Sequence, residues 1–298
     1  MVKVVKTPGM DIQVPKGSAF SYKTEPALPK AHMVTIAVGK RGAGKSVAVT
    51  SLIKRLKYDR LFVISPTFNS NSVLMNQFNN VDQNDVFEDP DDLTIVDTIQ
   101  ERINAERDEL VLYHEQLKQY KRLLKLMGDN ISRIPDELLL QFYSNGSFQP
   151  PTHRYGGRNP FCAVLIDDCQ SSKLFTHKKI LNLTIKHRHL GAFPDDRPSI
   201  GASLFFLIQN YRSSGGGSLP RTIRNNCTNA LIFKSKDEKE LEHIAAEMSG
   251  EIEKHLFMEA YEYATEKDGP HGFLFIDLHK KDEHPSIFRS RFDKFLCI

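Results

Sequence analysis

The sequence predicts an α/β protein with a mainly parallel central sheet that is flanked by helices. Short apolar runs recur along its 298 residues, and stretches with helical spacing separate them. The runs are apolar throughout rather than alternating, as expected of strands that are covered on both faces. A glycine-rich segment follows the first run directly and leads into the first helical stretch. Together these observations favour strands and helices that alternate along the chain.

The first part of the chain divides into a lead-in and an ordered core. Residues 1–30 contain four prolines and little periodicity, so we expect an irregular segment there. We expect residues 31–298 to form a single domain. Its first predicted elements are a strand over 33–38, a helix over 47–56 and a strand over 61–64.

A helical insertion is predicted over about residues 91–145, with a long helix over 91–127 and a looser one over 135–143. Two apolar series with seven-residue spacing mark the long helix: Ile103, Leu110, Leu117 and Leu124, and then Tyr113, Tyr120 and Met127. The series suits an amphipathic helix that packs on its own domain. A coiled-coil or subunit contact is the alternative that the pattern leaves open.

Beyond a loop over 145–160, strands and helices alternate again. The predicted elements are strands over 161–166, 203–208, 229–233 and 272–278, and helices over 173–190, 237–248 and 252–265. Ser235 and Glu238 have the spacing of a capping box before the helix over 237–248. The helices and strand within 237–298 complete the predicted domain.

The glycine-rich segment matches the phosphate-binding pattern GxxxxGK[ST] at every fixed position. Such a loop lets backbone N–H groups converge on a phosphate, and the following helix adds the positive end of its dipole. In this pattern the lysine reaches the β- and γ-phosphates and the hydroxyl ligates Mg²⁺. ATP and Mg²⁺ are therefore the predicted cofactors. The predicted phosphate-binding residues are Gly39, Lys40, Arg41, Gly42, Ala43, Gly44, Lys45 and Ser46.

Polar side chains end two of the later predicted strands. Asp167 and Asp168 follow the strand over 161–166, and Gln209 follows the strand over 203–208. Ligands bind at the carboxyl edge of a parallel sheet, so we predict that Asp167 holds the metal with Ser46. Asp168 is then the catalytic group that orients or deprotonates water. Gln209 is predicted to sense the γ-phosphate, although a plain polar strand terminus stays open.

Two further constellations are weaker. Arg188 and Arg224, with Arg221, are candidates for an arginine finger supplied to a neighbouring subunit, although a surface or phosphate-contacting role is favoured for each because nothing local marks a finger. Zinc is disfavoured, because the histidines and cysteines lack ligand spacing. The four cysteines are scattered without CxxC spacing, which favours a reducing intracellular setting. The longest apolar runs are also too short to cross a membrane.

The net charge of +3 conceals two opposite blocks. Residues 82–109 contain eleven acids and two arginines, a net charge of −9. Residues 169–236 contain eleven Lys or Arg and two aspartates, a net charge of +9. The basic block includes the predicted sensor strand and a glycine-rich segment over 213–218, so it is a candidate for contact with a phosphate backbone. A solvated basic face is the alternative, as is a plain linker for the glycine-rich segment.

Five segments together resemble the poxvirus-type DNA-packaging ATPases of large DNA viruses and virophages, a branch of the FtsK–HerA superfamily. They are residues 38–46, 64–67, 165–168, 206–210 and 219–225. The resemblance implies a P-loop NTPase fold of RecA-like (ASCE) type. It implies a homo-oligomeric ring, a pentamer or hexamer, that hydrolyses ATP between subunits and moves double-stranded DNA into a preformed capsid. It also implies capsid or portal partners, in host cytoplasm, a viral factory or the virion.

Two other functions remain open on the sequence alone. A nucleoside or small-molecule kinase also starts with a phosphate loop, although the acidic pair and the glutamine favour water as the acceptor. A nucleotide-regulated scaffold with slow turnover belongs to a different class. DNA-stimulated ATP hydrolysis distinguishes a motor from both.

Overall fold

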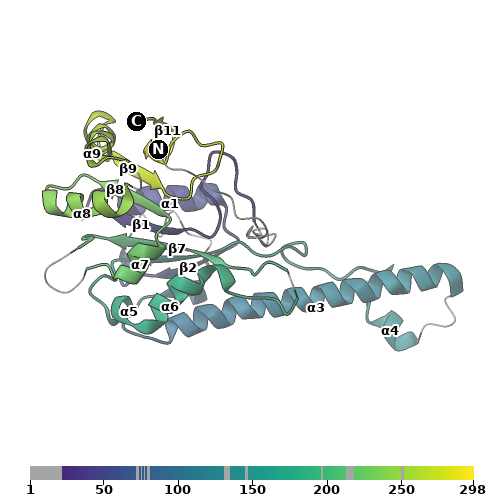
Figure 1. The fold of residues 1–298 in the computed structure, drawn as a ribbon. Coiled ribbons are helices and arrows are strands. Elements are labelled where there is room, and N and C mark those ends of the chain that lie inside the picture. The colour runs from purple at the N-terminus through teal and green to yellow at the C-terminus, as the bar shows by residue number, and fades with distance from the viewer. Residues whose placement is uncertain are drawn as a thin grey trace, which may run out of the picture.

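The computed structural model describes residues 22–298, except 72, 73, 75, 77, 79, 80, 131–134, 145, 146, 196, 213–217, 250 and 251. Most of the predicted lead-in and all but the last residue of the glycine-rich segment over 213–218 lie outside the described residues. A nine-stranded sheet forms the centre, in the order β11-β10-β9-β8-β1-β7-β6-β2-β3 (Figure 1).

Six of these strands are parallel, which confirms the predicted architecture. They are β1 (Val34–Val38), β2 (Arg60–Ile64), β3 (Val86–Phe87), β6 (Cys162–Asp167), β7 (Ala202–Ile208) and β8 (Asn229–Phe233). Strand β7 lies between β1 and β6, with Ile36 opposite Phe206 on one side and Ile166 opposite Phe206 on the other. This inserted strand, between the phosphate-loop strand and the acidic strand, is the arrangement expected of the RecA-like type.

The remaining strands of the sheet extend it in the antiparallel sense. β9 (Phe273–Asp277) pairs with β8, β10 (Phe288–Ser290) with β9, and β11 (Lys294–Leu296) with β10. The sequence predicted only β9 of these three. A separate two-stranded ribbon, β4 (Tyr143–Ser144) with β5 (Ser147–Phe148), was also not predicted.

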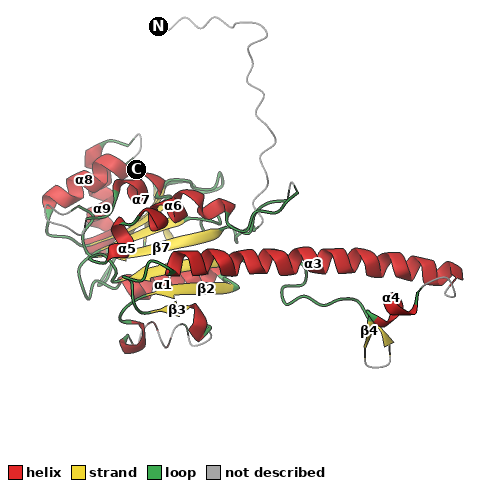
Figure 2. Cartoon of the chain, turned by 90° about the horizontal axis from the view of Figure 1, so that it is seen from below, coloured by secondary structure: helices red, strands yellow, loops and turns green. Residues whose placement is uncertain are grey.

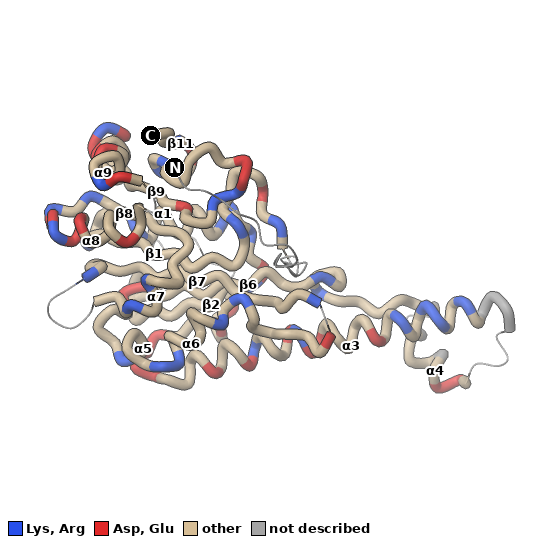
Figure 3. The backbone as a smooth tube through the Cα atoms, in the orientation of Figure 1, with Lys and Arg blue, Asp and Glu red and all other residues tan. Residues whose placement is uncertain are grey.

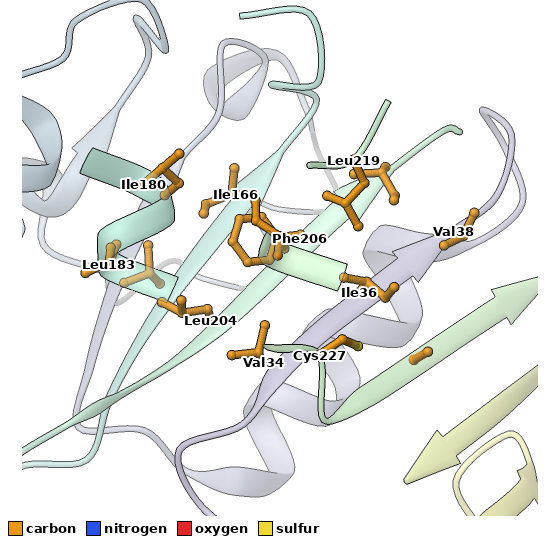
Figure 4. Packing of buried hydrophobic residues seen from close by; sticks show 14 of the residues in the cluster. Val34, Ile36, Val38, Ile166, Ile180, Leu183, Leu204, Phe206, Leu219 and Cys227 are labelled. Carbon is orange, nitrogen blue, oxygen red and sulfur yellow. The ribbon is translucent and has the colours of Figure 1, made fainter. Parts of the chain in front are cut away.

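Helices cover both faces of the sheet, as the unbroken apolar strands require. Helix α1 (Lys45–Leu56) packs on one face through Val49, Leu52 and Ile53. The other face is covered by α3 (Ile95–Asn130), α5 (Lys173–Thr176), α6 (Lys178–Lys186), α7 (Arg221–Asn226), α8 (Glu238–Met248) and α9 (Lys254–Glu262). Figure 4 shows the second core, in which Val34 and Ile36 of β1 lie near Phe206 of β7. Alternate residues of each strand thus enter opposite cores.

Helix α3 is 36 residues long and extends far past the sheet, with the short helix α4 (Asp136–Leu140) beside its far end (Figures 1 and 2). Its near half packs on the domain through Ile103 and Leu110, as predicted. The seven-residue series fails further out, because Leu124 is 45% exposed and its neighbour Leu123 is buried instead. Leu123 packs with Phe142 and the rings of Tyr120 and Phe148, so the far half is covered by the insertion itself.

Two predicted helix features were wrong in detail. The helix over 173–190 is interrupted at His177, whose ring Nδ1 accepts a hydrogen bond from the Lys179 N–H at 3.2 Å and so caps α6. A 3₁₀ turn over His187–His189 then ends this region. Helix α8 begins after Asp237, whose carboxylate accepts from the Glu240 N–H at 3.1 Å, so the expected cap formed by Ser235 is displaced by two residues.

Candidate nucleotide site

The phosphate loop joins β1 to α1 in the conformation that its glycines permit. Gly42 and Gly44 have φ of 81° and 102°, in the left-handed region that is strained for other residues. Helix α1 starts directly at Lys45, so the N–H groups of its first turn face the loop. A Cβ on Gly39 would lie 2.7 Å from the Cβ of Phe233 at the end of β8, so this position also needs glycine. The predicted anion cradle is therefore present.

Lys45 lies over this loop. Its Nζ donates to the carbonyl oxygens of Gly39 at 2.6 Å and Lys40 at 3.2 Å. Burial lowers the pKa of Lys45, while Asp167 and Asp168 act in the opposite direction. The ammonium group thus sits at the loop beside two carboxylates, in position to meet a triphosphate.

Asp167 is the last residue of β6, and only 7% of it is exposed. Burial raises its pKa to about 6, against the opposing effect of Lys45. The Ser46 hydroxyl donates to Asp167 Oδ2 at a distance of 3.4 Å. A buried carboxylate beside a serine hydroxyl is an oxygen donor set that suits Mg²⁺, and a bound cation would favour the ionised form. The residues present therefore fit the predicted metal.

Asp168 and Gln209 approach each other across the ends of β6 and β7. Gln209 Nε2 donates to Asp168 Oδ1 at 3.4 Å, and both residues are exposed. Asp168 has a φ of 55°, an uncommon conformation for a residue other than glycine. The chain turns at Asp168, directly after β6, so Asp167 is buried while Asp168 is exposed. The arrangement keeps the predicted metal ligand and the predicted catalytic acid in different environments.

A cavity of about 1060 Å³ brings these groups together. Lys45, Ser46, Asp167, Asp168 and Gln209 all line it. Thr67 and Asn71, which follow β2, line the same cavity.

Sequence reasoning missed three residues at this site. Gln170 accepts hydrogen bonds from the N–H groups of Gln209 and Asn210 at 2.9 and 3.3 Å, so it ties the acidic turn to the sensor strand. His271 and Arg291 line the cavity from the C-terminal part of the chain. Gln170 stands only two residues after Asp168, which is a signal that local inspection offers. No local signal marks the other two.

Two of the three candidate finger residues, Arg224 and Arg188, lie in different surroundings. The Arg224 side chain is 9% exposed, with Nε 3.7 Å from Glu247 Oε2 and the guanidinium 5.4 Å from the centre of the Tyr211 ring. Arg188 is exposed in the 3₁₀ turn beside the start of β7, where His187 Nδ1 lies 2.9 Å from Ala202 O. Arg188 is therefore at the opposite sheet edge from its own chain's phosphate loop. Accessibility favours it over Arg224 for a contact with another molecule.

The acidic and basic blocks partly face each other. Lys179 of α6 donates to Asp97 of α3 at 2.5 Å, and the Lys173 N–H donates to Asp91 Oδ1 at 2.7 Å. Lys179 is therefore part of a packing contact rather than an open basic face. Exposed members of the basic block are Lys173, Lys178, Lys186, Arg188, Arg212, Arg221, Lys234 and Lys236. Figure 3 shows a further basic stretch on the far half of α3, where Lys118, Lys121, Arg122 and Lys125 occur.

Within the described residues there is no group of three or more His, Cys, Asp or Glu side chains placed to hold a metal ion. No helix in the described part of the chain is long and apolar enough to span a membrane.

Comparisons with known proteins gave likenesses in structure only. No family model matches the chain, and no curated protein matches it. The DNA-packaging ATPase B204 from Sulfolobus turreted icosahedral virus has a TM-score of 0.45 and 13% identity, covering 88% of this chain and 97% of that one. The genome packaging NTPase B204 from Sulfolobus turreted icosahedral virus 2, in complex with ATP-gammaS, gives 0.42 and 14%, covering 83% and 92%.

A third similar structure is the pCW3 conjugation coupling protein TcpA with ATPgS. Its TM-score is 0.41 at 16% identity, covering 88% of this chain and 61% of that one. All these scores lie below 0.5, so the assignment of the fold depends on the strand order described above.

Proposed function

We propose that this protein is an ATP hydrolase that couples hydrolysis to the translocation of double-stranded DNA. One observation carries the enzymatic part: Lys45, Ser46, Asp167, Asp168 and Gln209, from three parallel strand ends, line a single cavity. Each has the chemistry that one step of hydrolysis needs. The proposal of DNA translocation rests on the sequence resemblance to DNA motors of the FtsK–HerA superfamily. The proposal of viral genome packaging rests on the resemblance to the poxvirus-type branch of that superfamily.

The residues divide the reaction between them. The loop N–H groups and Lys45 bind and orient the phosphates, and Ser46 with Asp167 would hold Mg²⁺. When bound, Mg²⁺ neutralises charge on the β- and γ-phosphates. Asp168 accepts a hydrogen bond from the attacking water and orients or deprotonates it. Gln209, which contacts Asp168, reports the loss of the γ-phosphate to β7 and to the chain that follows it.

Motor action requires contacts between neighbouring subunits and contacts with DNA. We propose a homo-oligomeric ring, a pentamer or hexamer, in which Arg188 or Arg224 reaches a neighbouring subunit's nucleotide. Exposed basic residues such as Lys178 and Arg221 would contact the DNA phosphates. Such contacts do not depend on the DNA sequence. A packaging role adds capsid or portal partners and an intracellular or virion-associated setting.

The decisive test measures ATP hydrolysis with and without double-stranded DNA. A motor is expected to hydrolyse ATP faster with DNA, and Lys45→Ala is expected to abolish turnover in both conditions. A kinase would be unaffected by DNA and stimulated by a small acceptor instead. A scaffold would turn over slowly in every condition. Images of particles formed with DNA and a non-hydrolysable analogue should show a ring with a central channel.

A further inference from the structure

The phosphate loop has two different neighbours, one on each side, and this asymmetry orients a bound nucleotide. Strands β7 and β6, which carry Gln209, Asp167 and Asp168, lie on one side of β1. Strands β8, β9 and β10 lie on the other side. Given the proposed function, the γ-phosphate points toward Asp168. The ribose and base must then extend toward the side of β9 and β10.

The cavity continues in that direction and is walled by the C-terminal part of the chain. Pro270, His271, Arg291, Phe292 and Asp293 line it there. His271 Nδ1 lies 3.3 Å from Ala43 O, so the C-terminal wall touches the phosphate loop itself. The turn before β9 is closely packed, since a Cβ on Gly272 would lie 2.2 Å from Ala264 O. The wall is thus a built part of the cavity.

Arg291 is held in this wall by its backbone and one end of its guanidinium. Its N–H donates to Phe273 O at 3.0 Å, and Nη2 donates to the carbonyls of Asp268 and Pro270 at 2.9 and 3.2 Å. Nε has no hydrogen-bond partner among the described residues. The φ of 53° shows that the backbone adopts an uncommon conformation at this position. A cationic plane is therefore fixed at the cavity without an ion pair to a carboxylate in the described structure, although its charge helps to lower the pKa of nearby Asp268.

We infer that Arg291 and Asp293 bind the nucleoside half of the nucleotide. The guanidinium of Arg291 contacts the base by stacking or by donating hydrogen bonds, and the exposed carboxylate of Asp293 accepts from ribose hydroxyls. This inference rests on the proposed function, because the orientation of the triphosphate depends on the roles of Asp167 and Asp168. It assigns nucleotide recognition to a segment about 250 residues from the phosphate loop.

The test compares two ligands that share phosphates but differ in the nucleoside: ATP and inorganic tripolyphosphate, each with Mg²⁺, measured by titration calorimetry. Arg291→Ala is expected to weaken ATP binding about tenfold and to leave tripolyphosphate binding unchanged. Asp293→Asn, at an exposed position, should act in the same direction by a few-fold. Unchanged ATP binding by either folded variant, or an equal loss for both ligands, overturns the inference for that residue.

Two controls separate the possible causes. Lys294 lies in the same β10–β11 hairpin as Arg291 but does not line the cavity. Lys294→Ala removes its salt bridge to Asp268, and ATP binding should persist. If it falls as in Arg291→Ala, the wall has merely loosened and the inference fails. If Arg291→Ala does not fold, Asp293→Asn decides. Wild-type protein that binds neither ligand, or whose affinity does not depend on Lys45, refutes the proposed function instead.

Discussion

Gln170 Oε1 accepts a hydrogen bond from the backbone N–H of Gln209 at 2.9 Å, and this joins the acidic turn to the end of the neighbouring strand. Gln170 Nε2 donates in return to Asn210 O at 2.5 Å. Two residues of β7's carboxyl end are thus fixed by one amide side chain. Because Gln209 also donates to Asp168, two side-chain contacts connect the acidic turn with the end of β7.

We therefore expect Gln170→Ala to separate hydrolysis from nucleotide binding. Without the hydrogen bonds of the Gln170 side chain, Gln209 and Asp168 are less well oriented. Small errors in the position of such groups strongly reduce the rate of catalysis. The kcat of ATP hydrolysis should fall about tenfold, with little change in KM. Steady-state kinetics provide the measurement. A rise in KM at unchanged kcat would show that Gln170 supports binding rather than orientation.

Asp168→Asn tests the role of the Asp168 carboxylate in activating water. The amide keeps the size of the side chain but cannot accept a proton, so the rate should fall by about 100-fold or more. Affinity for ATP should stay within a few-fold, because the loop and Lys45 are untouched. Single-turnover hydrolysis and nucleotide titration measure the two quantities. Retention of wild-type turnover would remove Asp168 from the mechanism.

Much of the site was predictable because its signals are local. The phosphate loop, Asp167 and Asp168 stand beside apolar runs that are covered on both faces, and such runs predict strands without knowledge of partners. Gln209 follows the same rule. Parallel strands end at one edge, so these residues meet once the strand order is known.

The C-terminal wall was not predictable, because it depends on pairing between distant segments. β10 contains Arg289, which is 2% exposed, so its sequence does not look like a buried strand. Its charge is accommodated by the Ala27 carbonyl at 2.7 Å and by Asp277 and His284. The antiparallel pairing of β8, β9 and β10 brings Arg291 to the cavity that the phosphate loop also lines.

The pKa of Asp167 leads to a prediction about stability. Burial raises this pKa from 3.8 to about 6, so the folded protein disfavours the ionised form. The resulting cost to folding develops as pH rises from about 4 to 6 and persists above that range. Asp167→Asn should therefore stabilise the protein on the order of 2 kcal/mol at pH 7.5 in EDTA, and by little at pH 4. Urea unfolding at the two pH values measures this, and an equal gain at both would contradict it.

The base of the long helix is fixed by a buried ionic network, and Glu106 is its centre. Glu106 Oε1 accepts from Arg60 Nη1 at 2.7 Å and pairs with Arg154, while Asp85 accepts from Arg60 Nε at 2.7 Å. The Glu106 side chain is 0% exposed, so Glu106→Ala leaves Arg60 short of a partner next to the core. Unfolding free energy should fall by about 3 kcal/mol.

Glu109→Ala is the matched control, because Glu109 also contacts Arg154 but is 58% exposed, and its loss should cost less than about 1 kcal/mol. Denaturant unfolding compares the two, and equal effects would show that the network does not fix the helix. Nucleotide binding by folded Glu106→Ala protein should be unchanged, since Arg60 and Glu106 do not line the nucleotide cavity.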